Sequence, residues 1–242
     1  MAYEVTPTVG TSRASSLAAA AASGVVLWTF ILYVVSTGFL GRNKTSHIIT
    51  LNATHGVLST LASTITLYFG LDTTLSVAIS LSYFLVDLFV MVHSDGPRNI
   101  LSLRQSRLMD YGHHILGLYW GIVLFKNEAT VCDASFGNAY VWMQTNEVST
   151  GFYNWFRLTD SRVAGAMFAI SFFFSRIVFN TVYIIPRVAT QCQPLYILGC
   201  SPYFVLQYVW FYMIARKLLS GGSQVHKIRG EHSSELENKK NK

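Results

Sequence analysis

Residues 75–92 read LSVAISLSYFLVDLFVMV, an apolar run that carries one charged side chain, Asp87. A helix needs about 20 predominantly apolar residues to cross the hydrocarbon core of a bilayer. Stretches of similar character lie on both sides of this run, so the sequence predicts an all-α polytopic membrane protein with about seven transmembrane helices. The predicted spans are residues 18–40, 48–70, 75–92, 109–125, 134–156, 163–185 and 193–215.

The composition agrees with this class. Of 242 residues, 51% are hydrophobic and 12% are charged, whereas about a quarter of the residues in an ordinary soluble domain are charged. The mean hydropathy is +0.37. The formal net charge of +6 comes from basic residues near the ends of the spans, and no basic run is interleaved with aromatic residues. We therefore predict no nucleic-acid partner.

The chain is predicted to hold one membrane domain, residues 18–219, between two polar ends. Residues 1–17 are interpreted as a flexible N-terminal tail and residues 220–242 as a polar cytosolic tail. No signal peptide is expected, because the first apolar stretch is too long and lacks a basic segment directly before it. No internal repeat is evident.

The loop charges predict the orientation. With seven spans, fourteen Lys and Arg residues fall on the side of the C-terminal tail, and three fall on the other side, namely Arg13, Lys126 and Arg187. The remaining one, Arg176, lies within the sixth span. Cytoplasmic loops carry an excess of Lys and Arg. We therefore expect the C-terminus in the cytosol and the N-terminus across the membrane.

The last four residues, KKNK at 239–242, fit the dilysine form that retrieves membrane proteins to the endoplasmic reticulum from a cytosolic tail. We therefore expect an integral protein of the endoplasmic reticulum. The alternative is a different membrane, including a mitochondrial one, with the dilysine end a coincidence.

Ionisable and amide side chains recur at similar depth in the predicted spans. Such groups are costly in a bilayer and usually face the bundle interior. Most fall in the cytosolic half, with Arg176 near mid-depth, which predicts a cavity open to the cytosol and lined by spans two to six. The candidate catalytic residues are His113, His114 and Asp110, and the candidate substrate-binding residues are Asn52, His55, Asp87, Glu147, Asn154 and Arg176.

Each of these residues also has a structural interpretation. Asp87 and Asp110 suit helix ends or pairs with loop arginines, and His55 suits a packing contact between helices. Glu147 and Arg176 suit a pair that neutralises itself and fixes helix register. The adjacent histidines are harder to explain in this way, because both can border one cavity and a carboxylate one turn away can orient an imidazole. No HExxH-like spacing accompanies them, so we predict no bound metal.

Five blocks of the sequence, in order, resemble the TLC (TRAM–LAG1–CLN8) domain family. They are Asn52 with His55; residues 82–87, SYFLVD; Asp110 with His113 and His114; residues 147–152, EVSTGF, with Asn154 and Arg157; and residues 173–176, FFSR. The resemblance covers about residues 40 to 220. It implies a six-helix core around a lipid-accessible cavity, preceded here by one N-terminal helix, and a role in membrane-lipid metabolism or sensing.

The chain departs from the ceramide synthases in that family. There the paired histidines are followed by a motif with paired aspartates, whereas here residues 115–121 read ILGLYWG. The sequence is more similar to the TLC-domain-containing branch, whose members are tied to phospholipid composition.

Three functions follow as hypotheses. The first is acyl-CoA-dependent lipid acyl transfer, with a histidine as base or acyl carrier, Asp110 orienting it and Arg176 meeting an anionic group. Acyl-CoA is then a co-substrate, no cofactor is bound, and the loop from Arg98 to Arg107 holds its phosphates. The second is non-catalytic binding of membrane lipids. The third is an accessory transmembrane subunit with partner subunits in a larger membrane assembly.

The same reasoning makes predictions about bonds. The three cysteines lack the CxxC spacing of a zinc module. Cys132 and Cys192 fall in loops on the lumenal side, where disulfides can persist, and we predict a disulfide between them. Cys200 should be a free core thiol. Glu147 and Arg176 are expected to pair, and His55, Asp87, His113 or His114, Glu147 and Arg176 to line or border one cavity.

Overall fold

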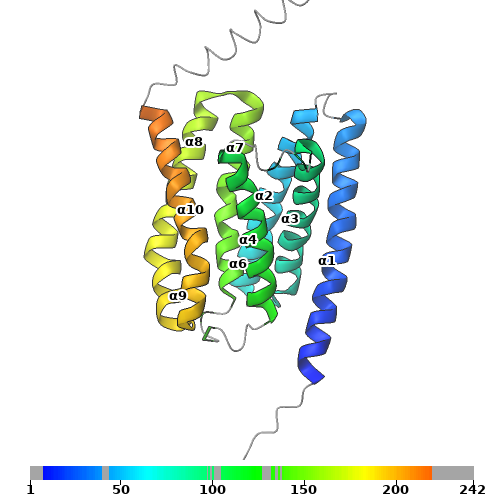
Figure 1. Cartoon of the computed structure of the whole chain (residues 1–242), viewed down its shortest axis with the longest axis vertical. Helices are drawn as coiled ribbons and strands as arrows, with labels where there is room; N and C mark the ends of the chain where they lie inside the picture. The colour runs from blue at the N-terminus through cyan, green and yellow to red at the C-terminus, as the bar shows by residue number, and fades with distance from the viewer. Residues whose placement is uncertain are drawn as a thin grey trace, which may run out of the picture.

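The computed structural model describes residues 8–39, 44–96, 98, 100, 105–126, 132–133, 136 and 138–219. These residues are almost entirely helical, and their rods stand side by side in one bundle (Figure 1). The four unbroken helices after the first are α2 (Lys44–Phe69), α3 (Thr74–Asp95), α4 (Gln105–Lys126) and α10 (Pro194–Leu219). The others contain π or 3-10 turns. The first runs through α1 (Thr8–Val34) and η1 (Val35–Phe39).

The fifth rod is α6 (Ala139–Gln144), η3 (Thr145–Glu147) and α7 (Val148–Thr159), and the sixth is α8 (Arg162–Phe172), η4 (Phe173–Val178), η5 (Asn180–Ile184) and α9 (Ile185–Gln191). Four stretches of the described residues are long and apolar enough to cross a membrane: Ser15–Thr37, Thr74–Asp95, Arg162–Gln191 and Pro194–Leu219. The other three rods are α2, α4 and the fifth. They hold most of the candidate site residues, whose polar side chains lower the mean hydropathy of these helices.

The distribution of side chains is that of a membrane protein. Large apolar residues point outward along several helices, among them Phe30, Tyr68 and Phe89, while charged and amide groups such as Asp87 and Arg176 are buried. In a soluble protein, charged side chains are almost never fully buried without a partner and large exposed apolar patches are rare. The apolar surface therefore suits contact with lipid, and the polar interior requires internal partners.

Helix α3 lies inside the bundle. In the stretch of α3 that is apolar enough to cross a membrane, 61% of the residues are buried, against 11% in the corresponding stretch of α1. Helix α3 packs on α1, α2 and α4. In Figure 1 α1 stands at one edge of the bundle, and α8, α9 and α10 stand at the opposite edge. Helix α1 is fastened to α3 by a hydrogen bond from Trp28 Nε1 to the Ile79 carbonyl, 3.0 Å. At Gly24 the two helices touch so closely that a Cβ would overlap the Ser82 side chain.

Two helical irregularities fall at candidate site residues. A 3-10 turn over Thr145–Glu147 joins α6 to α7 and includes Glu147, and the π segments η4 and η5 include Arg176 and Asn180. Irregular turns of this kind inside longer helices often mark functional sites or local constraint. Neither was expected from the sequence.

The observed helix ends correct several predicted boundaries. The first helix begins at Thr8, inside the predicted tail 1–17, because its Ala- and Ser-rich start continues the helix before the apolar run. The fifth rod begins at Ala139 rather than residue 134, since the Asn138 side chain caps it by accepting from the Tyr140 N–H, 2.9 Å. The sixth and seventh helices extend to Gln191 and Leu219. Residues 220–242, with the KKNK end, lie outside the described residues.

The predicted disulfide is confirmed. Cys132, in the connection between α4 and α6, is bonded to Cys192, between α9 and α10, with a Cα–Cα distance of 4.0 Å. The backbone pairs beside it, as the Asp133 N–H donates to the Gln191 carbonyl, 2.8 Å. Cys200 is a free, buried cysteine, as predicted.

The disulfide should contribute substantially to stability. It closes a sequence separation of 60 residues, and cross-links of this kind stabilise proteins by about 2–4 kcal/mol, mainly by constraining the unfolded chain. Replacement of Cys192 by Ser, or reduction of the bond, is expected to lower the thermal unfolding temperature of the purified protein. Cys200→Ala serves as the control, because it keeps the bridge and should keep the sensitivity to reductant. An unfolding temperature that is the same with and without reductant contradicts this prediction.

Candidate functional site

Helix α3 presents a polar side chain on nearly every turn of one face. Ser76, Ser80, Tyr83 and Asp87 follow one another at helical spacing and are all buried. Each contacts a different polar residue of a neighbouring rod. These partners are Gln144 at 2.9 Å, Tyr140 at 3.1 Å, Asn52 at 2.7 Å and His114 at 2.8 Å. Helix α3 is therefore the polar axis around which α2, α4 and the fifth rod assemble.

His114 is held from both sides. Its Nε2 lies 2.8 Å from Asp87 Oδ2, and its Nδ1 lies 2.8 Å from the backbone carbonyl oxygen of Asp110. The carboxylate contact is a close approach without hydrogen-bond geometry at Nε2. His114 and Asp87 thus form a buried histidine–carboxylate pair.

This pairing corrects the predicted role of Asp110. Its carboxylate is 46% exposed and lies 3.8 Å from Arg107, so it does not orient a histidine. Asp110 holds His114 through its backbone, and the orienting carboxylate is Asp87. Arg107, predicted to hold CoA phosphates, is itself bonded to Asp95, 2.8 Å. Residues 101–104 of that loop lie outside the described residues.

His113 differs from its neighbour. Its Nδ1 is buried and has no hydrogen-bond partner among the described residues. Its ring packs edge-on against Phe84 and Trp210, with centroids 5.6 and 5.3 Å apart, and lies over Tyr203 at 6.2 Å. His114 Nε2 also lacks a partner with hydrogen-bond geometry, but the Asp87 carboxylate lies 2.8 Å from it, whereas no carboxylate of the described residues pairs with His113.

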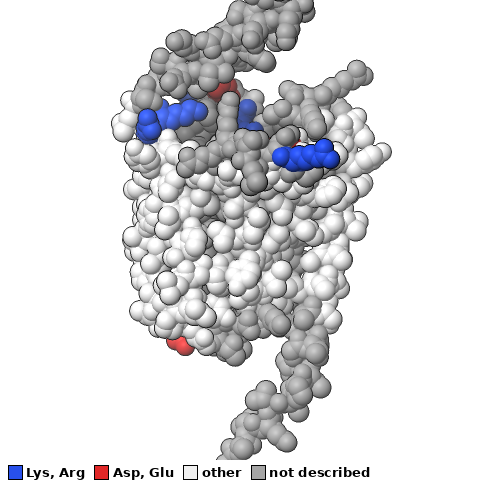
Figure 2. Space-filling view, viewed as in Figure 1, with Lys and Arg blue, Asp and Glu red and all other residues white. Residues whose placement is uncertain are grey.

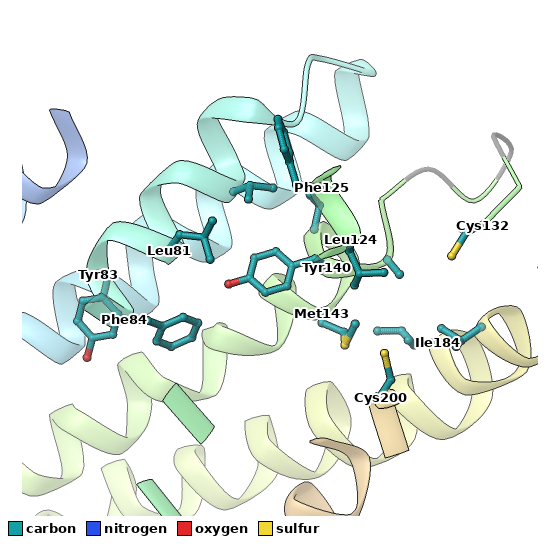
Figure 3. Packing of buried hydrophobic residues seen from close by; sticks show 14 of the residues in the cluster. Leu81, Tyr83, Phe84, Leu124, Phe125, Cys132, Tyr140, Met143, Ile184 and Cys200 are labelled. Atoms are coloured by element: carbon teal, nitrogen blue, oxygen red, sulfur yellow. The ribbon is translucent and has the colours of Figure 1, made fainter. Parts of the chain in front are cut away.

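A small cavity adjoins His113. Its volume is about 30 Å³. The lining comes from α3, α4, the fifth rod and α10, and consists of Ser80, Phe84, His113, Leu116, Gly117, Trp120, Tyr140, Met143, Gln144, Glu147, Cys200 and Tyr203. Figure 3 shows Tyr140 reaching toward Leu81 and Phe84.

The cavity is much smaller than the lipid-accessible chamber that the family resemblance implies. Of the predicted site residues, His113 and Glu147 line it. His55 and Asp87 are not among its lining residues. The Phe84 ring centroid is 5.5 Å from that of His55 and 5.1 Å from that of His114. The predicted site residues therefore form neighbouring clusters, and two of them, His113 and Glu147, line the cavity.

Glu147 and Arg176 form the predicted charge pair. Arg176 Nη2 donates to Glu147 Oε1 at 3.0 Å, and the two residues are 4% and 6% exposed. The guanidinium also donates to Ser149 at 2.8 Å and to Gln207 and Thr150 at 3.0 Å. Thr150 links the two charged groups, because its hydroxyl accepts from Arg176 and donates to Glu147 Oε2, 2.6 Å.

With four of its N–H bonds directed at protein oxygens, Arg176 has little capacity left for an anionic ligand. The same network continues through Asn180, which donates to the Arg176 carbonyl, 2.7 Å, and accepts from Asn146, 2.9 Å. Asn146 also donates to the Tyr203 hydroxyl, 3.1 Å, which lies at the cavity.

The remaining predicted residues hold the helices together. His55 stacks on Tyr83, with ring centroids 3.6 Å apart, and Trp28 of α1 meets it edge-on at 6.0 Å. Asn52 accepts from the Tyr83 hydroxyl. Asn154 is buried and donates to the Thr150 carbonyl within its own helix, 2.8 Å.

Several residues of the site were not singled out from the sequence, among them Ser80, Tyr140, Ser149, Tyr203 and Gln207. A signal existed for Gln207, because an amide inside a strongly apolar span needs an internal partner. The serines and tyrosines give no comparable signal, since both are common in membrane helices.

Within the described residues, no group of three or more His, Cys, Asp or Glu side chains is placed to hold a metal ion. Comparison with known proteins gives no relative: no family model, curated protein or solved structure matches the chain.

Proposed function

We propose that the protein is a membrane-embedded, TLC-like acyltransferase that moves an acyl group from acyl-CoA to a membrane lipid. The observation that carries this proposal is the histidine arrangement. His113 borders a cavity with an unpartnered ring nitrogen, while the adjacent His114 is fixed by Asp87. A general base needs a free nitrogen within reach of the reacting group and a surrounding structure that holds it in place.

In this proposal His113 is the catalytic base and takes the proton of a lipid hydroxyl or amine. His114 and Asp87 are positioning residues, because both nitrogens of His114 already face oxygen atoms. His113 stands eight residues into α4, about 12 Å from the start of that helix at a rise of 1.5 Å per residue. A thioester on the long arm of CoA reaches this depth from the cytosol.

The proposed setting is a seven-span protein of the endoplasmic reticulum, with the C-terminus in the cytosol. Two observations support it. The seven helical rods of the described residues coincide with the predicted apolar stretches, and the Lys and Arg side chains of the visible face gather at the end of the bundle where α7 meets α8 (Figure 2). The loop charges favour the orientation.

The orientation predicts the glycosylation pattern. Asn43 and Asn52 each begin an acceptor triplet, Asn-Lys-Thr and Asn-Ala-Thr. Asn43 falls on the cytosolic side and outside the described residues, and Asn52 lies inside α2, so neither should carry a glycan. Treatment of the protein from a eukaryotic host with an endoglycosidase should leave its gel mobility unchanged. A Glu4→Asn variant creates an Asn-Val-Thr acceptor near the N-terminus and should become sensitive. A glycan on Asn43 inverts the orientation.

The acyl-transfer activity is tested by incubating the purified protein, in lipid nanodiscs, with labelled acyl-CoA and a membrane-lipid extract. The expected result is label in a lipid product and release of free CoA, both absent for a His113→Ala, His114→Ala double variant. Lipid that co-purifies with the protein but is not acylated from any acyl-CoA counts against the enzyme and supports lipid binding.

A second function, the accessory subunit, is favoured by one observation. The interior is closed by its own contacts, since the cavity is small and Arg176 is engaged by protein oxygens. A protein whose buried polar groups only fix helix packing would look similar. Recovery of a stoichiometric membrane complex from native membranes, without acyl transfer, selects this function.

A further inference from the structure

The cavity beside His113 limits what the site can accept. Its volume is about 30 Å³, against about 150 Å³ for an engineered apolar cavity that binds benzene. A fatty-acyl chain of sixteen carbons needs many times the space of this cavity. A group of two or three carbons is of the same size as the cavity.

The walls leave no slack for a longer chain. Around the cavity, helices approach at glycines where even one added carbon meets a neighbour. A Cβ at Gly117 would lie 2.5 Å from Phe84 Cε2, and one at Gly121 would lie 2.6 Å from Leu81 Cδ2 and 2.9 Å from Tyr140 Cζ. At Gly199 a Cβ would overlap the Trp120 ring. Close-packed interiors of this kind do not expand without cost.

Tyr140 lines the cavity, and its hydroxyl is held by a contact with Ser80, 3.1 Å. The Tyr140 ring belongs to a cluster of buried apolar side chains that includes Leu124 and Phe125 (Figure 3). Close packing of this cluster opposes the extension of a longer chain past Tyr140.

The lining suits a short acyl group chemically. Phe84, Met143 and Cys200 provide an apolar surface for a methyl or ethyl end, and the His113 imidazole stands at the same cavity. An apolar lining with a few polar groups is usual for a small-ligand site.

We propose that the transferred group is a short acyl group of two or three carbons, supplied by acetyl-CoA or propionyl-CoA. This inference rests on the proposed acyl-transfer function and specifies its substrate. The lipid oxygen or nitrogen forms a bond to the thioester carbonyl carbon, the C–S bond breaks, and the proton taken by His113 passes to the CoA thiolate. The products are the acetylated or propionylated lipid and free CoA thiol, so the reaction needs no oxidant or further reactant.

The test compares acyl-CoA chain lengths in the nanodisc assay. Product formation from acetyl-CoA is expected to exceed that from palmitoyl-CoA by roughly 100-fold or more in kcat/KM, because each methylene that a pocket excludes costs about 10- to 200-fold. Transfer from palmitoyl-CoA but not from acetyl-CoA overturns this inference and leaves the acyltransferase intact. Absence of transfer from every chain length overturns the acyltransferase itself.

Enlarging the cavity tests the same point from the protein side. Met143→Ala should raise the rate with butyryl-CoA relative to acetyl-CoA by about 10-fold or more, because it removes a lining side chain and enlarges the cavity. The matched control is Met167→Ala, on the exposed side of α8, which should keep the wild-type preference. Cys200→Ala is a milder enlargement, used if Met143→Ala does not fold. An unchanged chain-length preference in the enlarged variants contradicts the cavity as the determinant.

Discussion

Replacing Arg176 by alanine is expected to destabilise the protein by about 3–5 kcal/mol, the usual effect of removing one partner of a buried ion pair. The change leaves the Glu147 carboxylate in an apolar interior with the Thr150 hydroxyl as its remaining partner. It also removes the donors to Ser149 and Gln207, which tie the fifth and sixth rods to α10. Thermal unfolding of the purified protein, followed by size-exclusion chromatography of the heated samples, measures the loss.

The control is Arg187→Ala. Arg187 lies over the Tyr183 ring, 4.2 Å from its centroid, near the end of the sixth rod, and has no ion pair that the structure records among the described residues. Its removal should change the unfolding temperature little, because exposed or half-exposed charges contribute little to stability.

A double variant separates the charge from the packing. Arg176→Met with Glu147→Leu removes both charges and keeps most of the volume, and replacement of a buried pair by apolar residues is often neutral or stabilising. The double variant should therefore be more stable than Arg176→Ala. A double variant that is as unstable as the single one shows that the pair is needed for more than neutralisation, and contradicts this account of the network.

The sequence was sufficient to predict the Glu147–Arg176 pair and the Cys132–Cys192 bridge. Arg176 is the only Lys or Arg placed inside a predicted span, and Glu147 is a carboxylate at similar depth, so charge neutralisation leaves few choices. The bridge followed from topology, which puts both cysteines on one side of the membrane. Both predictions depend only on how deep a residue lies in the membrane and on which side its loop falls. The order of the apolar stretches in the sequence gives both.

The carboxylate that pairs with His114 could not be predicted from depth and side. Asp87 and Asp110 lie at similar depth, and the choice between them depends on how α3 and α4 are rotated about their axes. The size of the cavity was also unpredictable, because it depends on the rotamers of Phe84 and Trp120 and on contacts at Gly117 and Gly199. Side-chain packing of this kind is set by the whole bundle, whereas depth is a property of one helix.

The individual histidines should behave differently when each is replaced by alanine. His113→Ala is expected to lower kcat for acyl transfer by about 10²- to 10⁴-fold, the range for loss of a general base. Its effect on the unfolding temperature should be smaller than that of His114→Ala, because it removes ring contacts but leaves no buried carboxylate without a partner. His114→Ala should lower both activity and stability, since it leaves the Asp87 carboxylate buried without its partner.

The measurements are kcat in the nanodisc assay and the unfolding temperature of each variant. His93→Ala is the matched control, because His93 is an exposed histidine of α3 that stacks on Phe89, away from the cavity. Adding Asp87→Asn to His114→Ala should restore part of the stability, because the unpaired charge is then gone, while the activity stays low. If His113→Ala retains wild-type kcat and His114→Ala loses it, the roles are reversed: His114 must then release Asp87 to act as the base, and a ligand would have to displace a contact that now measures 2.8 Å.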